Sequence, residues 1–484
     1  MTTSAPGRTT TAPAPAPSAT HDNRLRRLGL AVVLAAEVMD LLDATIVGVV
    51  SPSIQADFGG SSTQIQWIAA GYTLPFAMLM ITGARLGDIL GRRRMFLIGV
   101  VGFAACSLLC ACSVSVGMLI GMRVAQGAFA ALMVPQGLGL VRELFPPAEL
   151  SGAFAVFGPV MGLAAVGGPV LGGFLTDADV LGTGWRSVFL INVPLGVAAF
   201  LTALRVLPES RAPHAPRLDL PAVPLAGAAV LLVLYPLVQG RDLGWPLWTY
   251  LMMAAALPVL GLFVLYQRAV RRRGGSPLIE PGLFRHHGYS GSLAVGLVFF
   301  AGLSGLLLVI PLYLQYGLGF TPLRAGLAMI PWAFGSVIGA TLSGAWLSKR
   351  YGRTVIQIGL LTSAAGLAAA AWTVHAAHSP GAWQLAPSLL VSGIGLGLVM
   401  APFFDIALAG VSDREAGSAS GVLNAVQQLS GAVGVAVLGT VFFGRVRDGF
   451  AGAAETTLLA AAGALVVASL VTFLMPRQAA HPEG

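Results

Sequence analysis

The stretch Gly83–Met95, GARLGDILGRRRM, ends one long apolar run and is followed by another. A single acid, Asp88, lies near the end of the first run, Gly91 interrupts the helical pattern, and the arginines Arg92–Arg94 follow at once. In a bilayer this pattern is typical of a tight turn between two spanning helices, because arginines collect in short cytoplasmic loops. The stretch therefore predicts a membrane protein and places this turn on the cytoplasmic side.

A second copy of the stretch lies in the other half of the chain, at Gly344–Arg353, GAWLSKRYGR. Its glycines and its last arginine align with those of the first copy, whereas Lys349 takes the place of Asp88. Equivalent positions in two halves indicate an internal duplication, which is how many transporters are built.

Composition excludes a water-soluble fold. Of the 484 residues, 56% are hydrophobic and 10% are charged, and the mean hydropathy is +0.81; soluble domains carry about 25% charged residues. The net charge of +8 comes from arginines clustered between apolar runs, which indicates membrane topology and no nucleic-acid partner. The three cysteines share one apolar run, so we expect no disulfide, no metal site and no cofactor.

Runs of about 20 apolar residues predict membrane-spanning helices. Fourteen runs meet this rule, at 28–52, 66–86, 95–114, 117–140, 152–175, 186–207, 221–239, 248–268, 290–316, 323–347, 354–374, 384–408, 418–443 and 454–475. An all-α membrane protein with 14 transmembrane helices is therefore predicted.

The duplication divides these helices into two halves. The predicted order is a disordered tail (1–27), a six-helix half (28–207), linkers with two additional helices (208–289), a second six-helix half (290–476) and a short tail (477–484). Arginines cluster in every second loop, which places both termini in the cytoplasm. The prediction is a multi-pass protein of the inner (cytoplasmic) membrane.

The first helix carries three acids, Glu37, Asp40 and Asp43. Each ionisable group in a spanning helix costs about 2.5–3.5 kcal/mol on insertion scales. At spacings of three the acids fan over about 120° of one helix face, which we expect to look into a polar cavity. Repulsion between them favours holding a proton, so they are candidates for proton coupling; the alternative is simple hydrogen bonding to neighbouring helices.

Two further helices carry candidate cavity residues. Arg123 lies inside the fourth helix, followed by Gln126, and a buried guanidinium must meet a carboxylate or a wet cavity. A purely structural ion pair is the alternative to proton coupling for Arg123. Asp405, in the twelfth helix, is a candidate substrate-cavity residue together with Gln126 and Asp43.

The fifth helix reads GPVMGLAAVGGPVLGG from Gly158 to Gly173. Closely spaced glycines let helix backbones approach, and prolines bend a helix. Tight packing alone would explain the glycines, whereas the added prolines favour a helix that also pivots. The candidate packing and pivot residues are Gly158, Pro159, Gly168, Pro169, Gly172 and Gly173.

Taken together, these motifs resemble the major facilitator superfamily, in particular its fourteen-helix drug:proton antiporter branch. LLDATIVGVVSPSI (Leu41–Ile54) is similar to that branch's first-helix signature, with Asp43 as its acid and Gly48 where asparagine is usual. RVAQGAFAA from Arg123 resembles the fourth-helix motif linked to proton transfer, and WRSVFLINVP from Trp185 resembles the signature that opens the sixth helix. The fifth-helix glycines and prolines resemble the antiporter motif that separates exporters from importers.

The resemblance also assigns a role to the stretch Gly83–Met95. GARLGDILGRRRM resembles the loop motif between helices two and three, whose acid docks near a helix of the second half and locks the outward-facing state. It implies a conformational latch formed by Asp88, Gly91, Arg92 and Arg93, with Ile89 in place of the usual basic residue.

The functional hypothesis is a proton-coupled antiporter that exports amphipathic organic compounds, drugs or antibiotics, by alternating access. Its expected partners are a small-molecule organic substrate, protons and the lipid bilayer, and a monomer is expected. An exporter of an endogenous secondary metabolite and an importer or uniporter of small solutes are alternatives. A channel is disfavoured because no filter loop repeats in both halves, and a membrane enzyme because no nucleophile, base or metal set is present.

Overall fold

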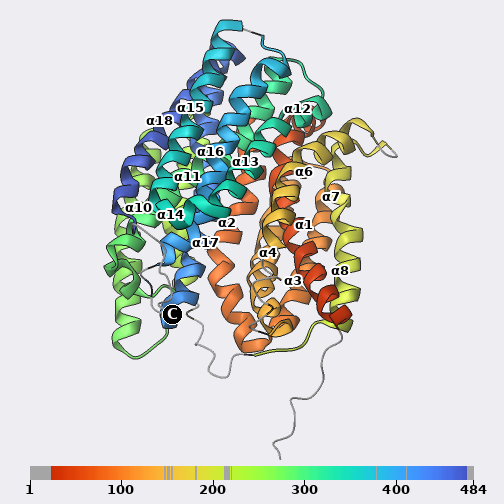
Figure 1. Cartoon of the computed structure of the whole chain (residues 1–484). Helices are drawn as coiled ribbons and strands as arrows, with labels where there is room; N and C mark the ends of the chain where they lie inside the picture. Colours follow the sequence, from red (N-terminus) through yellow and green to blue (C-terminus); the bar gives the residue numbers. More distant parts are fainter. Residues whose placement is uncertain are drawn as a thin grey trace, which may run out of the picture.

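The computed structural model describes residues 23–146, 149, 153, 156–179, 182–211, 219, 221–377, 379–409, 411 and 413–476. Every regular element within these residues is a helix, as Figure 1 shows. The predicted all-α class is therefore confirmed. Of the expected tails, residues 1–22 and 477–484 lie outside the described residues, whereas residues 23–27 are not disordered as predicted but form the first turn of α1.

The helices follow one another along the whole described chain. They are α1 (Asn23–Phe58), α2 (Ser62–Leu90), α3 (Arg92–Ala111), α4 (Val116–Leu144), α6 (Phe157–Asp177), η2 (Gly184–Arg186), α7 (Ser187–Leu190), α8 (Asn192–Val206), α9 (Ala222–Gln239), α10 (Leu247–Arg272), η3 (Pro281–Arg285), α11 (His287–Leu312), η4 (Tyr313–Gly317), α12 (Pro322–Ala328), α13 (Ile330–Leu342), η5 (Ser343–Leu347), α14 (Ser348–Tyr351), α15 (Arg353–Ala377), α16 (Ala382–Leu408), α17 (Asp413–Arg445), η6 (Val446–Asp448), α18 (Phe450–Val471) and η7 (Thr472–Leu474).

Twelve helical stretches of the described chain are long and apolar enough to cross a membrane. The helices α1 and α6 are not among them, although they have 36 and 21 residues. The acids Glu37, Asp40 and Asp43 lower the apolar character of α1. The membrane class is supported, and the count of fourteen spans stays a prediction.

Helices α1 to α8 and helices α11 to α18 pack around different apolar cores, and Ile65 of α2 joins the core of the second group. Figure 1 shows the first group in red to yellow and the second in cyan to blue. The green helices α9 and α10 lie beside them, and α9 packs against both α2 and α17.

Two predicted helices are broken where the sequence predicts continuous ones. The expected helix 186–207 is divided at Ile191 between α7 and α8, and the expected helix 323–347 at Met329 between α12 and α13. Prolines lie just after both breaks, at Pro194 and Pro331. Because proline lacks an N–H and clashes with the preceding turn, it prevents a continuous hydrogen-bond ladder.

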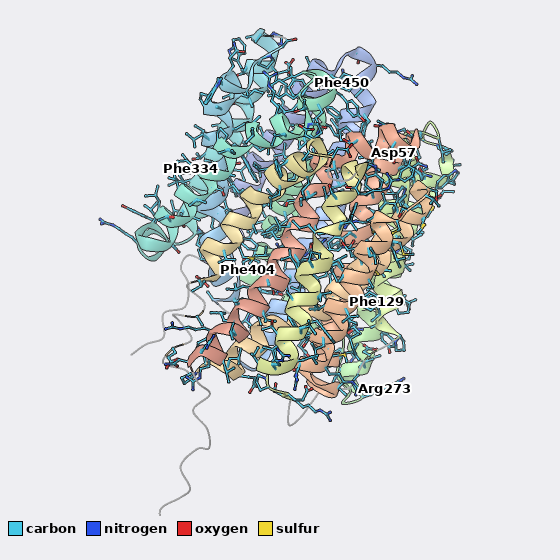
Figure 2. All side chains as sticks on the ribbon, turned by 90° about the vertical axis from the view of Figure 1, so that its right-hand side faces the viewer. Asp57, Phe129, Arg273, Phe334, Phe404 and Phe450 are labelled. Atoms are coloured by element: carbon cyan, nitrogen blue, oxygen red, sulfur yellow. The ribbon has the colours of Figure 1, made fainter. Side chains whose placement is uncertain are left out.

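The two groups of helices are held together at one end of the bundle. Figure 2 places Asp57 and Phe450 toward this end and Arg273 at the opposite end; we call them the Asp57 end and the Arg273 end. At the Asp57 end, the Gln315 amide donates to the carbonyl of Val49 (2.6 Å) and the Tyr316 hydroxyl to Gln55 (2.5 Å).

The helices α6 and α12 also meet near the Asp57 end. The Leu323 N–H donates to the Asp177 carboxylate (3.1 Å). A Cβ added at Gly173 would collide with the backbone of Pro322, and one at Gly326 with the carbonyl of Pro169. Glycine is thus required on both helices for this close approach.

Gly326→Ala is expected to lower the stability of the purified protein by about 1–3 kcal/mol, because the new methyl group meets backbone that cannot rotate away. The thermal unfolding midpoint in detergent measures this loss. Gly463→Ala in α18 is the matched control, since a Cβ there has nothing within 4 Å. Equal midpoints for both variants would contradict the proposed close packing.

Candidate functional site

The centre of the site is an ion pair between Asp43 of α1 and Arg123 of α4. Both side chains are only 1% exposed. Arg123 also donates from Nε to the carbonyl of Ile68 (3.3 Å) and from a terminal nitrogen to Gln126 Oε1 (2.9 Å). A buried ion pair needs such additional hydrogen bonds, because its mutual attraction alone does not offset the loss of water.

Two amides complete the surroundings of Asp43. Gln126 Nε2 donates to Asp43 Oδ1 at 3.0 Å, and Asn192 Nδ2 of α8 donates to the same oxygen at 3.2 Å. Both amides also donate to the hydroxyl of Ser107 on α3, at 3.3 and 2.9 Å. Each carboxylate oxygen of Asp43 is therefore hydrogen-bonded, and with the Arg123–Ile68 bond the network joins α1, α2, α3, α4 and α8.

Tyr72 of α2 connects this network to a second acid. Its hydroxyl donates to the Asp40 carboxylate, while its ring lies under the Arg123 guanidinium, 4.3 Å from ring centroid to Cζ. Such a cation–π contact gains strength away from water. The tyrosine thus touches both the Arg123–Asp43 pair and Asp40.

The three acids of α1 do not share one environment. Asp43 is sealed inside the half, whereas the side chains of Asp40 and Glu37 are partly exposed. This differs from the expected single cavity face, because α3, α4 and α8 close over Asp43. The structure brings Asp40, Asp43, Arg123 and Gln126 together, and Glu37 lies one turn of α1 away from Asp40.

Asp405 is not part of this group. It lies in the last turn of α16 with an exposed side chain. Its role in a substrate cavity stays a prediction. Among the described residues there is no cluster of three or more His, Cys, Asp or Glu side chains that could hold a metal ion.

The WRSVFLINVP motif contacts both the middle and the C-terminal end of α1. The Trp185 indole N–H and the Arg186 guanidinium donate to the Asp57 carboxylate, at 3.1 and 2.8 Å. These bonds hold the pKa of Asp57, which lies beyond the expected span 28–52, below its ordinary value. Seven residues further on, Asn192 reaches Asp43, so the motif fixes the position of α1 along its length.

The stretch Gly83–Met95 forms the expected turn between α2 and α3. Gly91 has φ +110°, in the left-handed region that favours glycine. Arg92 donates to Asp88 Oδ1 at 3.0 Å and lies 3.5 Å from a carboxylate oxygen of Glu143 on α4. Arg93 donates to the carbonyl of Leu204 on α8. The four expected latch residues therefore lie together at this turn.

The second copy also forms a turn with a glycine at positive φ. Gly352, which aligns with Gly91, also has a positive φ, of +54°. Arg353, which aligns with Arg92, donates to the carbonyls of Phe473 and Met475, at 2.9 and 3.0 Å. The side chain of Lys349 lies outside the described part. Both copies seen in the sequence thus form a turn with glycine at positive φ.

The glycines of α6 face two neighbours. A Cβ at Gly168 would collide with the Thr45 side chain of α1, and one at Gly172 would lie 3.0 Å from Ile46. Gly173 faces α12, as does Pro169 through its carbonyl. The side chains at positions 157–159, including Gly158 and Pro159, lie outside the described residues. The pivot role of the whole set stays a prediction.

Sequence reasoning missed Tyr72, Ser107 and Asn192 as members of the network. Asn192 lies within a quoted motif, so its position there was an available signal. Tyr72 and Ser107 are single polar residues in apolar helices, and such residues have no distinguishing pattern.

Comparisons with known proteins identify the family. The family model for the Major Facilitator Superfamily matches residues 33–435. The chain belongs to the Major Facilitator Superfamily. A probable actinorhodin transporter of Streptomyces coelicolor is 49% identical over 468 residues, covering 95% of this chain and 80% of that protein. A tetracenomycin C resistance and export protein of Streptomyces glaucescens is 35% identical, covering 87% and 77%.

Solved structures of other transporters share the fold. The inward-facing, occupied structure of a bacterial homologue of the human lysosomal transporter Spinster has a TM-score of 0.62 and 18% identity, covering 94% of this chain and 97% of that chain. Proteins of the superfamily are transporters, so this chain moves a small molecule across a membrane, and the expected absence of enzymatic activity is confirmed.

Arg123→Gln is expected to destabilise the protein by about 3–5 kcal/mol, because it leaves the Asp43 carboxylate buried without its cation. The double variant Asp43→Asn/Arg123→Gln removes both charges and should recover most of this loss. Thermal unfolding in detergent measures both effects. A double variant no more stable than Arg123→Gln would show that the charges of the pair are not coupled.

Proposed function

We propose that this chain is a proton-coupled antiporter that exports amphipathic organic compounds, drugs or antibiotics, across the cytoplasmic membrane by alternating access. The observation that carries the proposal is the buried Asp43–Arg123 pair with Asp40 beside it. Acids and a guanidinium at this depth are costly, so they are retained where their charges are used. The names of the relatives add the direction of transport, since they include an export protein and resistance proteins.

Asp40 and Asp43 have different parts in the proposed cycle. Asp40 is partly exposed and receives a proton first, while Asp43 is sealed by its partners. A proton on Asp40 removes its charge and changes the hydrogen bond from Tyr72, which also contacts Arg123. The protonation state of Asp40 thereby affects the Arg123–Asp43 pair through Tyr72. Glu37 adds a third acid on the same helix.

The energy available matches export. One proton moving down a potential of 100 mV supplies about 2.3 kcal/mol, which supports a roughly fiftyfold gradient of a neutral substrate. A proton enters from outside as substrate leaves, and substrate binds from inside after the proton is released. Coupling requires that the proton and the substrate are carried by the same movement of the two halves.

The structure fits the inward-facing state of this cycle. Hydrogen bonds between the described residues of the two halves gather toward the Asp57 end, away from the arginine-rich Arg273 end. With the positive-inside rule, the Arg273 end and both termini lie in the cytoplasm. In this state Asp88 pairs with Arg92 of its own turn, which leaves the proposed latch open. The protein acts as a monomer in this proposal.

A secondary metabolite is the second candidate for the substrate. The relative at 49% identity is named as a probable transporter of actinorhodin, and two others are named for tetracenomycin C and puromycin. We therefore propose that the substrate is a natural product of the producing cell or one of its close chemical relatives. A susceptibility panel of such compounds in an efflux-deficient bacterium expressing this chain tests the proposal, and unchanged susceptibility to all of them would refute it.

Asp43→Asn is expected to abolish proton-driven export, because it removes the charge that Arg123 holds, and to lower stability as Arg123→Gln does while leaving the protein inserted in the membrane. Export against a gradient in proteoliposomes with an imposed pH difference measures the loss. Asp448→Asn is the matched control, since this side chain is 71% exposed at the Asp57 end of the C-terminal half. Full export by Asp43→Asn would overturn the coupling role.

Asp88→Asn is expected to slow turnover more than it weakens substrate binding, because it removes the partner of Arg92 at the α2–α3 turn. Maximal export rate and substrate dissociation constant, measured on the same preparation, separate the two effects. A large loss of affinity with unchanged turnover would contradict the latch.

A further inference from the structure

The inserted helices α9 and α10 are tied to α2 near the Arg273 end. Arg85 of α2 donates to three successive carbonyls after α10, those of Ser276 (3.2 Å), Pro277 and Leu278 (3.3 Å). One planar guanidinium can satisfy several acceptors at fixed angles, which a lysine cannot. Arg85 therefore holds the chain that leaves α10.

A buried carboxylate fixes the same chain from within the insert. Asp219, 8% exposed, accepts hydrogen bonds from Tyr266 (2.8 Å), Gln267 (3.0 Å) and the N–H of Leu278 (3.2 Å). The two ends of the insert are thus joined to each other, and Arg85 joins both to α2.

A second tie to α2 lies at the other end of the insert. In the loop between α9 and α10, Arg241 donates to the hydroxyl of Ser62, and Asp242 accepts from the hydroxyl of Thr63. Ser62 and Arg85 stand at opposite ends of α2, about 34 Å apart at 1.5 Å per residue. The inserted helices α9 and α10 and their loops are therefore hydrogen-bonded to α2, a helix of the N-terminal half, near both of its ends.

The contact with α17, in the C-terminal half, is of a different kind. It is mainly apolar: Leu234 and Val238 of α9 pack with Ala432 and Ala436 of α17, in a cluster that also includes Ala70 and Leu74 of α2, and one hydrogen bond runs from Thr440 to the carbonyl of Leu237 (2.9 Å). The Arg241 guanidinium also lies 5.2 Å from the ring of Phe443. Smooth apolar surfaces of alanine and valine can slide, whereas the paired bonds on α2 have fixed geometry.

The chain changes core between Leu278 and Leu283. Leu278 packs with Ala222 and Phe263 of the insert, while Leu283 belongs to the core of the C-terminal half. Between them lie Pro281 and Gly282. Gly282 has the greatest backbone freedom in this short stretch. Its dihedral angles can therefore change when the inserted helices rotate relative to the C-terminal half.

We propose that α9 and α10 move as part of the N-terminal half, fixed to α2 by Arg85 and by Arg241 with Asp242, that α17 slides along α9, and that the chain flexes at Pro281–Gly282. The insert then serves as a guide that keeps α2 and α17 in register while the halves rock. This assignment requires movement of the halves and holds for any substrate.

Distances between paired spin labels test the assignment in the full-length protein, with the exposed Cys112 replaced by serine. Labels are placed at exposed positions of α10 (Leu257, 72%), α3 (Ile98, 41%) and α15 (Leu361, 48%). Between acidic and alkaline pH, the 257–98 distance should stay fixed, while 257–361 and 98–361 shift together. A shift in 257–98 that matches 98–361, or a fixed 98–361 distance, would overturn the proposal.

Arg85→Ala should broaden the 257–98 distance distribution, and Arg85→Lys should only partly restore it, because an ammonium group cannot serve three carbonyls in the same geometry. Arg272→Ala, at an exposed arginine of the last turn of α10, is the matched control and should leave the distribution narrow. An unchanged distribution in Arg85→Ala would show that Arg85 does not hold the insert. Loss of export without broadening would also contradict the positioning role.

Discussion

The structure depends on one electrostatic constraint: a carboxylate and a guanidinium inside an apolar bundle must find each other. Asp43 and Arg123 do so with side chains 1% exposed. A buried pair of this kind is costly unless its remaining hydrogen-bonding capacity is used. Gln126, Asn192 and the carbonyl of Ile68 use it, which fixes α2, α4 and α8 around α1.

The same constraint explains why the acids of α1 have different surroundings. Asp43 balances Arg123, so another carboxylate nearby has no full cationic partner inside the half. Asp40 accepts from a tyrosine hydroxyl, and its side chain and that of Glu37 are partly exposed. A group that is partly exposed can exchange protons, whereas a sealed pair can respond to that exchange. This division of labour suits coupling, because the acid that meets water differs from the pair that holds the helices.

Small residues allow the halves to meet at the Asp57 end. Gly173 and Gly326 bring α6 and α12 into backbone contact, while Gly168 and Gly172 bring α6 onto α1. Contacts of this type depend on close approach and carry no buried charge, so they can be broken and remade. The polar network inside the N-terminal half, by contrast, is not suited to being broken and remade. Its bonds are many and buried, and it fits a body that moves as a unit.

The sequence by itself determined the all-helical membrane class, the duplicated turn and the candidate acids, because apolar runs, charge clusters and positive-φ glycines are local properties. Gly91 and Gly352 illustrate this, since the aligned glycines share the left-handed backbone. Only the tertiary structure decided that Asp43 is sealed and that Asp405 ends α16 away from the network.

The breaks before Pro194 and Pro331 and the roles of Tyr72 and Asn192 also required the structure. A tyrosine or asparagine in an apolar helix has the same local pattern whether or not a charge lies opposite. Its partner comes from a helix distant in the sequence, and only the packing of helices brings the two together.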